Sequence, residues 1–214
     1  MMKHKTTNQT KLINQRLREL EKLDQSSDIR DILKRHWKIK EKKTLLWQIK
    51  PKTAKKLHNL IKINKPKTIL ELGTSAGYSA LIMLKANPNA KIHTIECIPY
   101  RIDMAKESFK KTKLDKNIIL HEHKIKHVLD EWTKTKAWKK NKIDFVLIDA
   151  DKENYEENTN KILPFLSKKA IIITDNVLDN PKKTEQYIKY MKSQKNLKTT
   201  IYKIENGILV AKRK

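Results

Sequence analysis

The stretch ILELGTSAGYSAL, residues 69–81, decides the fold of this chain. It starts as a short apolar run and then places Gly73 and Gly77 four residues apart, although the 214 residues hold only three glycines. Glycine is used where the backbone needs a positive φ or where another group must come close to it. We therefore expect a strand that turns sharply into a helix, with bare backbone on which a ligand can lie at the helix N-terminus.

The same pattern of strand and helix recurs after Pro66. Runs rich in apolar and β-branched residues predict strands, and the segments between them predict helices. The strands are expected at 67–72, 91–96, 117–121, 143–149 and 169–175, with helices at 77–87, 99–112, 124–136, 153–164 and 181–194. Such alternation is typical of a parallel sheet with helices on both faces.

The C-terminal part departs from this alternation. Asn206-Gly207 lies between the β-prone runs LKTTIYKI (197–204) and ILVAKR (208–213), which indicates an antiparallel hairpin. The sequence thus predicts an α/β, Rossmann-like sheet of seven strands, mostly parallel, with a C-terminal antiparallel hairpin. Residues 66–214 form this domain. Residues 1–65 form a basic N-terminal helical cover, since no Pro-, Gly- or Ser-rich linker separates the two parts.

The chain is strongly basic, with a net charge of +25 and 49 Lys and Arg residues. This balance suggests RNA or another polyanion as a partner. Trp37 and Trp138 lie within basic stretches, and such stretches suit phosphate contact combined with base stacking. Only six of the basic residues are arginine, however, so lysine-rich codon usage with a solvated surface is the alternative explanation.

Cysteine content and hydropathy bear on the compartment. Cys97 is the one cysteine of the sequence, so no intramolecular disulfide can form. No run approaches the roughly 18 apolar residues of a membrane span. The sequence predicts a cytoplasmic protein without a membrane partner.

Acidic residues follow most of the predicted strands. They are Glu71, Glu96, Asp149 in IDADK and Asp175, with Asn176, in TDN. Ligands of open α/β sheets bind at the carboxyl ends of the strands. Four of the five ends therefore bring a carboxylate to one edge of the sheet, which indicates a ligand site.

The first group of acids surrounds the glycine turn. Glu96 lies 23 residues after Gly73, where a carboxylate can accept hydrogen bonds from ribose hydroxyls. That feature alone fits NAD as well as S-adenosylmethionine (SAM). The glycine spacing is not GxGxxG, however, and Glu71 would repel a pyrophosphate but attract the ammonium and sulfonium of SAM. Charge therefore favours SAM.

The second group is Asp149, Asp175 and Asn176. Two carboxylates and an amide oxygen are hard ligands that suit Mg²⁺ or another divalent cation, with water and substrate completing the octahedron. The alternative is that Asp175 and Asn176 only form the turn after their strand. Their position opposite IDADK favours the metal site.

These motifs resemble the metal-dependent O-methyltransferases of the catechol and caffeoyl-CoA type, which have a seven-stranded sheet. The motifs are ILELGTSAGYSAL, IHTIE (92–96), IDFVLIDADKENY (143–155) and IIITDNVL (171–178). The resemblance implies a metal on Asp149, Asp175 and Asn176, catalytic roles for Lys152 and Asp149, and a homodimer. It implies that SAM is bound by Ile49, Glu71, Gly73, Thr74, Ser79, Glu96, Lys124, Ile125 and Asp149.

Two stretches depart from the family pattern. Ser167-Lys168-Lys169-Ala170 stands where the family often has Gly-Gly, so the turn there must be built differently. His123 and Lys124 stand where small residues are common, beside the expected adenine. His121, His123 and His127 lie close together in the sequence and could together bind zinc. We instead expect this segment to be a basic loop beside the cofactor.

The expected reaction is methyl transfer from SAM to a hydroxyl that has a second oxygen on the adjacent carbon, with Lys152 as base. Bacterial relatives in the resembled family methylate 5-hydroxyuridine at the tRNA wobble position, and that base offers such a pair of oxygens. Residues 1–66 carry 19 Lys and Arg against six Asp and Glu, which favours tRNA bound at its single-stranded anticodon loop. The alternatives are a catechol-like small molecule and a non-catalytic relative that only binds RNA.

Overall fold

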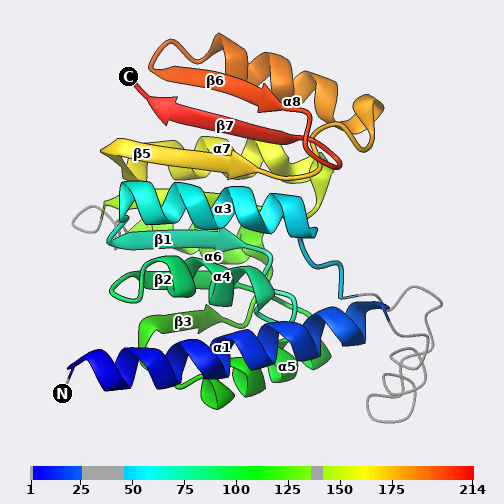
Figure 1. The fold of residues 1–214 in the computed structure, drawn as a ribbon. Helices are drawn as coiled ribbons and strands as arrows, with labels where there is room; N and C mark the ends of the chain where they lie inside the picture. Colours follow the sequence, from blue (N-terminus) through cyan, green and yellow to red (C-terminus); the bar gives the residue numbers. More distant parts are fainter. Residues whose placement is uncertain (1, 26–45, 136–141) are drawn as a thin grey trace.

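The computed structural model describes residues 2–25, 46–135 and 142–214, and a seven-stranded sheet forms its centre (Figure 1). The strands are β1 (Thr68–Leu72), β2 (Lys91–Ile95), β3 (Ile118–His121), β4 (Ile143–Ile148), β5 (Leu166–Thr174), β6 (Leu197–Tyr202) and β7 (Ile208–Arg213). Their order is β3-β2-β1-β4-β5-β7-β6. Strands β1 to β5 pair in parallel, and β7 is antiparallel to β5 and β6. The predicted fold class is confirmed.

Helices cover both faces of the sheet. One face carries α1 (Met2–Gln25), α3 (Pro51–Asn64), α4 (Tyr78–Ala86) and α5 (Pro99–Lys111). The other carries α6 (Ile125–Thr135), α7 (Tyr155–Ile162) and α8 (Pro181–Ser193). Short 3-10 helices are η1 (Asp115–Asn117), η2 (Lys152–Asn154) and η3 (Leu163–Phe165). In Figure 1, α3 and α1 lie in front of the sheet and α7 lies behind it.

Strand β1 is buried on both sides because both faces are covered. Ile69 packs with the core under α1, α3, α4 and α5, whereas Leu70 and Leu72 pack with the core under α6, α7 and α8. Side chains alternate along a strand, so Glu71 shares the side of Ile69. Glu71 is fully buried. A buried carboxyl group in an apolar strand needs polar partners, which points to a functional site at this end of β1.

The strand order reverses at β1. The chain places β2 and β3 on one side of β1 and then returns to place β4 on its other side. Open α/β sheets bind ligands at such a point, outside the carboxyl ends of the strands. Gly73 follows β1 here and Asp149 follows β4, and the Asp149 N–H donates to the Leu72 carbonyl at 3.0 Å. The topology therefore brings the two predicted groups of site residues to one place.

The loop between β6 and β7 caps the N-terminus of α3. This helix begins at Pro51, a position where the missing N–H is tolerated, and Lys50 before it provides no side-chain cap. Glu205 instead accepts hydrogen bonds from the N–H groups of Lys52 and Thr53, at 3.1 and 2.8 Å. A carboxylate at this end of a helix also interacts favourably with the helix dipole. The C-terminal hairpin thus fixes α3 against the sheet.

The structure differs from the sequence prediction at the start of β5. Strand β5 begins at Leu166 and not at residue 169, because η3 leads directly into it. Residues 167–170 are strand, so no glycine turn is needed. The pairing of β4 with β5 is irregular here, because Ile143 pairs with Leu166 but Phe145 pairs with Ile171. The additional residues of β5 between these two pairs form a bulge in the strand. Trp37 and Trp138, which we associated with RNA, lie outside the described residues.

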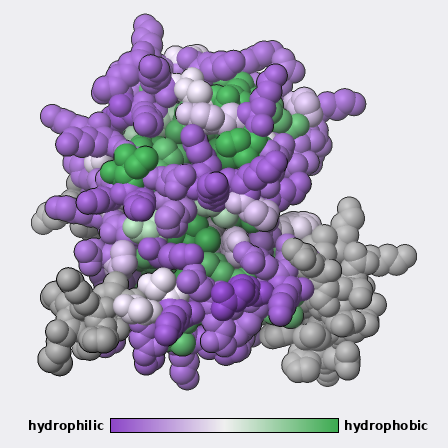
Figure 2. Space-filling view, viewed as in Figure 1, coloured by the Kyte–Doolittle hydropathy of each residue, from purple (hydrophilic) through white to green (hydrophobic). Residues whose placement is uncertain are grey.

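The face of the molecule that is seen in Figure 1 is mostly hydrophilic. Figure 2 shows hydrophilic residues over most of the face seen in Figure 1, with hydrophobic residues in smaller groups between them. No helix within residues 2–25, 46–135 and 142–214 is both long and apolar enough to cross a membrane.

Candidate active site

Both glycines of the turn after β1 have a positive φ, as expected for a sharp turn, with +99° at Gly73 and +87° at Gly77. A Cβ on Gly73 would lie 2.2 Å from the Asp149 carbonyl oxygen, and a Cβ on Gly77 would lie 2.6 Å from the ring of Phe109. The protein itself fills the space beside both glycines. The glycines therefore let the turn pack against β4 and α5, and that a ligand also lies on the backbone of this turn stays a prediction.

Glu71 lies at the centre of a buried hydrogen-bond network. Ser79 Oγ donates to Glu71 Oε1, and Thr94 Oγ1 donates to Oε2 at 2.5 Å. Thr74 Oγ1 lies 2.5 Å from Thr94 Oγ1 and extends the network into the turn. Burial raises the pKa of Glu71 to about 7, against the effect of the two hydroxyl donors, and the charge of Glu96 adds to the rise. A carboxyl group in this state is suited to a cationic partner, which would favour its ionised form.

Glu96 follows β2 and organises the backbone around it. Its Oε2 accepts the N–H of Ser75 at 2.9 Å. Its Oε1 accepts the N–H groups of Cys97 at 2.9 Å and Ile98 at 3.0 Å. Carboxylate oxygens have further lone pairs, so Glu96 can still accept hydrogen bonds from ribose hydroxyls. These contacts hold Glu96 beside the glycine turn, as the predicted role requires.

The other predicted SAM contacts come from two separate segments. Ile49 is buried just before α3, and a bond from Ser75 Oγ to the Leu46 carbonyl holds this segment against the glycine turn. Lys124 is exposed and directly precedes Ile125, the first residue of α6. Strand β3 ends before them at the same edge of the sheet as β2. The structure therefore places all three at the carboxyl edge of the strands.

Asp149 and Asp175 follow the neighbouring strands β4 and β5. Burial first, and then the negative charges of Asp175 and Glu71, raise the pKa of Asp149 above its ordinary value. Burial also raises the pKa of Asp175. The Oδ1 atom of Asp175 is buried and has no hydrogen-bond partner within the described part of the chain. A bound cation would relieve the repulsion between these groups and satisfy that oxygen.

Asn176 is held by a chain of hydrogen bonds from the C-terminal hairpin. Lys50 Nζ donates to Asn206 Oδ1 at 3.0 Å, and Asn206 Nδ2 donates to Asn176 Oδ1 at 3.0 Å. Asn176 Nδ2 in turn donates to Asp149 Oδ1 at 3.2 Å. An ammonium group can only donate, so Lys50 fixes the orientation of both amides. The hairpin thereby reaches the strand-end carboxylates.

The donor chemistry of this set fits a divalent cation of the magnesium type. Asp149 and Asp175 offer carboxylate oxygens, which are hard ligands. Asn176 can add an amide oxygen if its amide turns, because in the structure its Nδ2 faces Asp149 Oδ1 and its Oδ1 accepts from Asn206. For the zinc alternative, His121 Nε2 lies 3.1 Å from His93 Nδ1, so this histidine has a partner of its own. In the described ranges, no group of three or more His, Cys, Asp or Glu side chains could hold a metal ion. The predicted set has two such residues plus an asparagine, and it stays a prediction.

Lys152, the predicted base, begins η2 three residues after Asp149. Its Nζ forms an ion pair with Asp179 Oδ2 at 3.3 Å. Its positive charge lowers the pKa of Asp149 and of Asp175 against the larger effect of burial, so the ammonium acts on both carboxylates.

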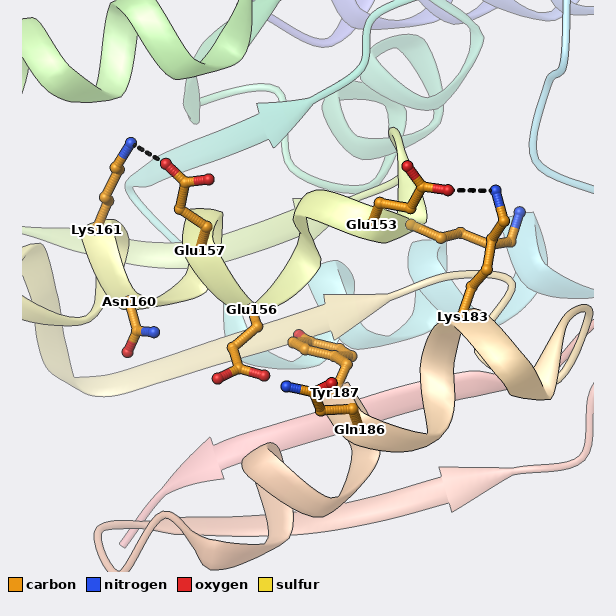
Figure 3. Close-up of a pocket in the computed structure, with 9 residues that line it drawn as sticks. Glu153, Glu156, Glu157, Asn160, Lys161, Lys183, Gln186 and Tyr187 are labelled. Carbon is orange, nitrogen blue, oxygen red and sulfur yellow. Dashed lines mark hydrogen bonds and ion pairs between the residues drawn. The ribbon is translucent and has the colours of Figure 1, made fainter.

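Lys152 also lines a surface pocket of about 440 Å³ between α7 and α8. Figure 3 shows the ion pair between Lys183 and Glu153 at one end of this pocket and the pair between Lys161 and Glu157 at the other. Its charged walls are thus largely paired with each other. Among the predicted site residues only Lys152 lines it, so we place the candidate site at the strand ends.

Sequence reasoning missed several residues that hold this site together, namely Ser75, Thr94 and Asn206. Thr94 lies opposite Glu71 in the register of β1 and β2, so a register prediction would have found it. Asn206 was recognised only as a turn residue. Its contact with Asn176 depends on the hairpin returning to the sheet edge, and no local pattern indicates that contact.

Comparison with known proteins identifies the family. Residues 23–212 match the family model described as O-methyltransferase. The chain belongs to the O-methyltransferase family. This confirms the O-methyltransferase family predicted from the strand-end motifs, while the metal dependence predicted with it stays a prediction.

Two curated relatives of this chain are of the catechol and caffeoyl-CoA type that the motifs predicted. A catechol O-methyltransferase of Niastella koreensis is 30% identical over 135 residues, 63% of this chain and 60% of the relative. A caffeoyl-CoA O-methyltransferase of Medicago sativa is 30% identical over 125 residues, 58% of this chain and 50% of the relative. The matches thus span 60% or less of the length of these relatives.

A solved structure agrees with the fold. The O-methyltransferase of Bacillus cereus in complex with S-adenosylhomocysteine (SAH) superposes on this chain with a TM-score of 0.75 at 20% sequence identity. The superposition covers 94% of this chain and 91% of that one. At that identity the likeness shows the fold alone, and the fold is the one described above.

Proposed function

We propose that this chain transfers a methyl group from SAM to a substrate oxygen and uses a divalent cation to do so. The observation that carries the proposal is Glu71, a buried carboxyl group beside the glycine turn. No basic side chain in the described part of the chain pairs with it or shifts its pKa. The ammonium group of SAM would supply the missing positive charge. Membership of the family and the SAH in the Bacillus cereus structure support the same cofactor.

In this proposal the residues of the turn bind and orient the cofactor. Glu71 accepts hydrogen bonds from the amino group, with Ser79 and Thr94 fixing its carboxyl plane. Glu96 accepts hydrogen bonds from the ribose hydroxyls and at the same time ties down the backbone of Ser75. SAM, when bound, supplies the methyl group on its sulfonium.

In this proposal Asp149, Asp175 and Asn176 would hold the cation. A divalent cation bound there would supply Lewis-acid chemistry that lowers the pKa of a substrate hydroxyl. Lys152 is the proposed base for the hydroxyl proton. Its ammonium form pairs with Asp179, so the amine must first lose its own proton to solvent. Asp179 thus keeps the side chain beside the carboxylates between turnovers.

As substrate we propose tRNA, with 5-hydroxyuridine at the wobble position methylated to 5-methoxyuridine. The net charge of +25 supports a polyanion. Exposed lysines run along α3 and the two residues that flank it, and they are Lys50, Lys52, Lys55, Lys62 and Lys65. Lys50 also reaches the site through its hydrogen bond to Asn206. A catechol-like small molecule is the second candidate, and the catechol and caffeoyl-CoA relatives favour it.

The test is to incubate the protein with labelled SAM and Mg²⁺, offering total tRNA and a panel of catechols, and then to identify methylated nucleosides by mass. We expect 5-methoxyuridine, lost in Asp149→Ala. Asp115→Ala is the matched control, since Asp115 is exposed in η1, at the opposite edge of the sheet. Methylated catechol with untouched tRNA would refute the substrate proposal. Full turnover in excess chelator would refute the role of the metal.

A further inference from the structure

Helix α1 contributes one buried charged residue to the body of the protein. The helix lies along α4 and α5 (Figure 1), and Arg16 on its inner side is only 5% exposed. Arg16 Nη1 pairs with Glu19 at 3.0 Å, and Nη2 pairs with Glu107 of α5 at 3.3 Å. Burial of a guanidinium group is unfavourable unless its hydrogen bonds are satisfied. The burial of Arg16 therefore indicates a structural role for its guanidinium group, which an arginine of the basic surface would not need.

The third bond of Arg16 leads to the glycine turn. Arg16 Nε donates to Ser108 Oγ at 3.0 Å. Ser108 is fully buried, and its own proton is shared between the carbonyls of Met104 and Ala76, both at 2.8 Å. Ala76 lies inside the turn between β1 and α4, next to Gly77. A relay of hydrogen bonds thus runs from α1 through α5 into the turn.

Two more contacts join the N-terminal segment to the same turn. Tyr78 OH, in the first residue of α4, donates to Glu21 Oε1 of α1 at 2.6 Å. Ser75 Oγ donates to the carbonyl of Leu46. Three of the four residues 75–78 are therefore held, directly or through Ser108, by residues that precede α3.

We propose that α1 is part of the cofactor site and that Arg16 is a positioning residue for the turn that binds SAM. The inference rests on the proposed function, which assigns SAM to this turn. Arg16 orients Ser108, Ser108 fixes the Ala76 carbonyl, and the neighbouring Ser75 and Gly77 keep the geometry that Glu96 and the cofactor need. Because binding linkages are reciprocal, SAM must also strengthen the docking of α1. Any partner that draws α1 away from α5 weakens cofactor binding.

The test compares Arg16→Met with Arg18→Met. Arg18 lies two residues further along the same helix and is exposed, so it is the matched control. Calorimetry with S-adenosylhomocysteine should show about tenfold weaker binding for Arg16→Met, a typical size for coupling between sites, and unchanged binding for Arg18→Met. Hydrogen exchange should show that S-adenosylhomocysteine slows exchange in α1 of the wild type and much less in Arg16→Met.

A second variant covers the case in which Arg16→Met does not fold. Ser108→Ala keeps the ion pairs of Arg16 but breaks the relay, and it should weaken S-adenosylhomocysteine binding in the same way. Equal affinity in all folded variants, or exchange in α1 that does not respond to the ligand, would overturn the inference while leaving the proposed function intact. A wild-type protein that does not bind S-adenosylhomocysteine would overturn the proposed function itself.

Discussion

Replacing Glu71 with glutamine should change how the stability of the ligand-free protein depends on pH. Glutamine keeps the shape of the side chain, can accept from one of the two hydroxyls and donate to the other, and cannot ionise. In the wild type, the unfolded chain ionises Glu71 near its ordinary pKa of 4.5, whereas burial in the folded chain raises the pKa to about 7. The folded state therefore holds this proton more tightly than the unfolded state does.

The size of the effect follows from the difference between these two values. Each tenfold change in proton affinity is worth about 1.4 kcal/mol, so Glu71 removes about 3 kcal/mol from the free energy of unfolding as the pH rises from 4.5 to about 7. Below pH 4.5 the group is protonated in both states and has no effect, and above about pH 7 the loss is complete. Asp149 and Asp175 add losses of the same sign in both proteins. The charge of Glu71 also raises the pKa of Asp149, so Glu71→Gln lessens the loss from Asp149 as well and widens the difference in the same direction.

Urea unfolding, followed by tryptophan fluorescence at pH 5 and pH 8, measures the difference. Between these two values the wild type should lose most of the 3 kcal/mol relative to Glu71→Gln. Glu185→Gln, which removes an exposed carboxylate of α8, should follow the wild type. The reasoning is refuted if Glu71→Gln loses as much stability as the wild type over this range.

Four further outcomes are expected. Gly73→Ala should lower the melting temperature strongly. A positive φ costs roughly 1–2 kcal/mol in a residue with a Cβ, and the new Cβ would clash with the Asp149 carbonyl. An unchanged melting temperature would contradict this reasoning. Glu205→Gln should lower the free energy of urea unfolding at fixed pH by about 1 kcal/mol through the weaker cap of α3, and no change would show that the cap is dispensable. Asp149→Asn should bind Mn²⁺ more weakly in calorimetry, since one of two carboxylates is lost, whereas equal affinity would remove this residue from the metal set. Lys152→Met should lower kcat by about 10²–10⁴-fold while S-adenosylhomocysteine affinity stays the same, and unchanged kcat would rule it out as the base.

The strand ends could be predicted from the sequence because they are local. Apolar, β-branched runs followed by an acid place Glu71, Glu96, Asp149 and Asp175 at one edge of any parallel sheet, whatever the details of packing. The strand bounds observed for β1, β2 and β4 agree with the predicted ones within a residue. Only β5 began earlier than predicted, since its first three residues, the buried Leu166, the half-buried Ser167 and the exposed Lys168, form no continuous apolar run.

The contacts that hold the site could not be predicted in this way, because they join residues far apart in the chain. The relay from Arg16 to Ser108 spans 92 positions, and the bond from Lys50 to Asn206 spans 156. The glycines show the same limit. Their sequence spacing indicated a sharp turn, but only the structure shows that the Asp149 carbonyl and the Phe109 ring occupy the space beside them.

The place of β7 between β5 and β6 also sets the order in which a growing chain can complete the site. Strand β6 joins the sheet through β7, and until β7 is made the outer edge of β5 has no partner. The N–H groups of Val177 and Leu178, just after Asn176, bond to the carbonyls of Gly207 and Asn206, so that turn is braced only when the hairpin exists. During translation, the strands up to β5 can assemble first, with the site half built and a bare strand edge exposed. A chain truncated before residue 205 would therefore expose the outer edge of β5 to edge-to-edge aggregation and would lack the hairpin contacts that brace the site.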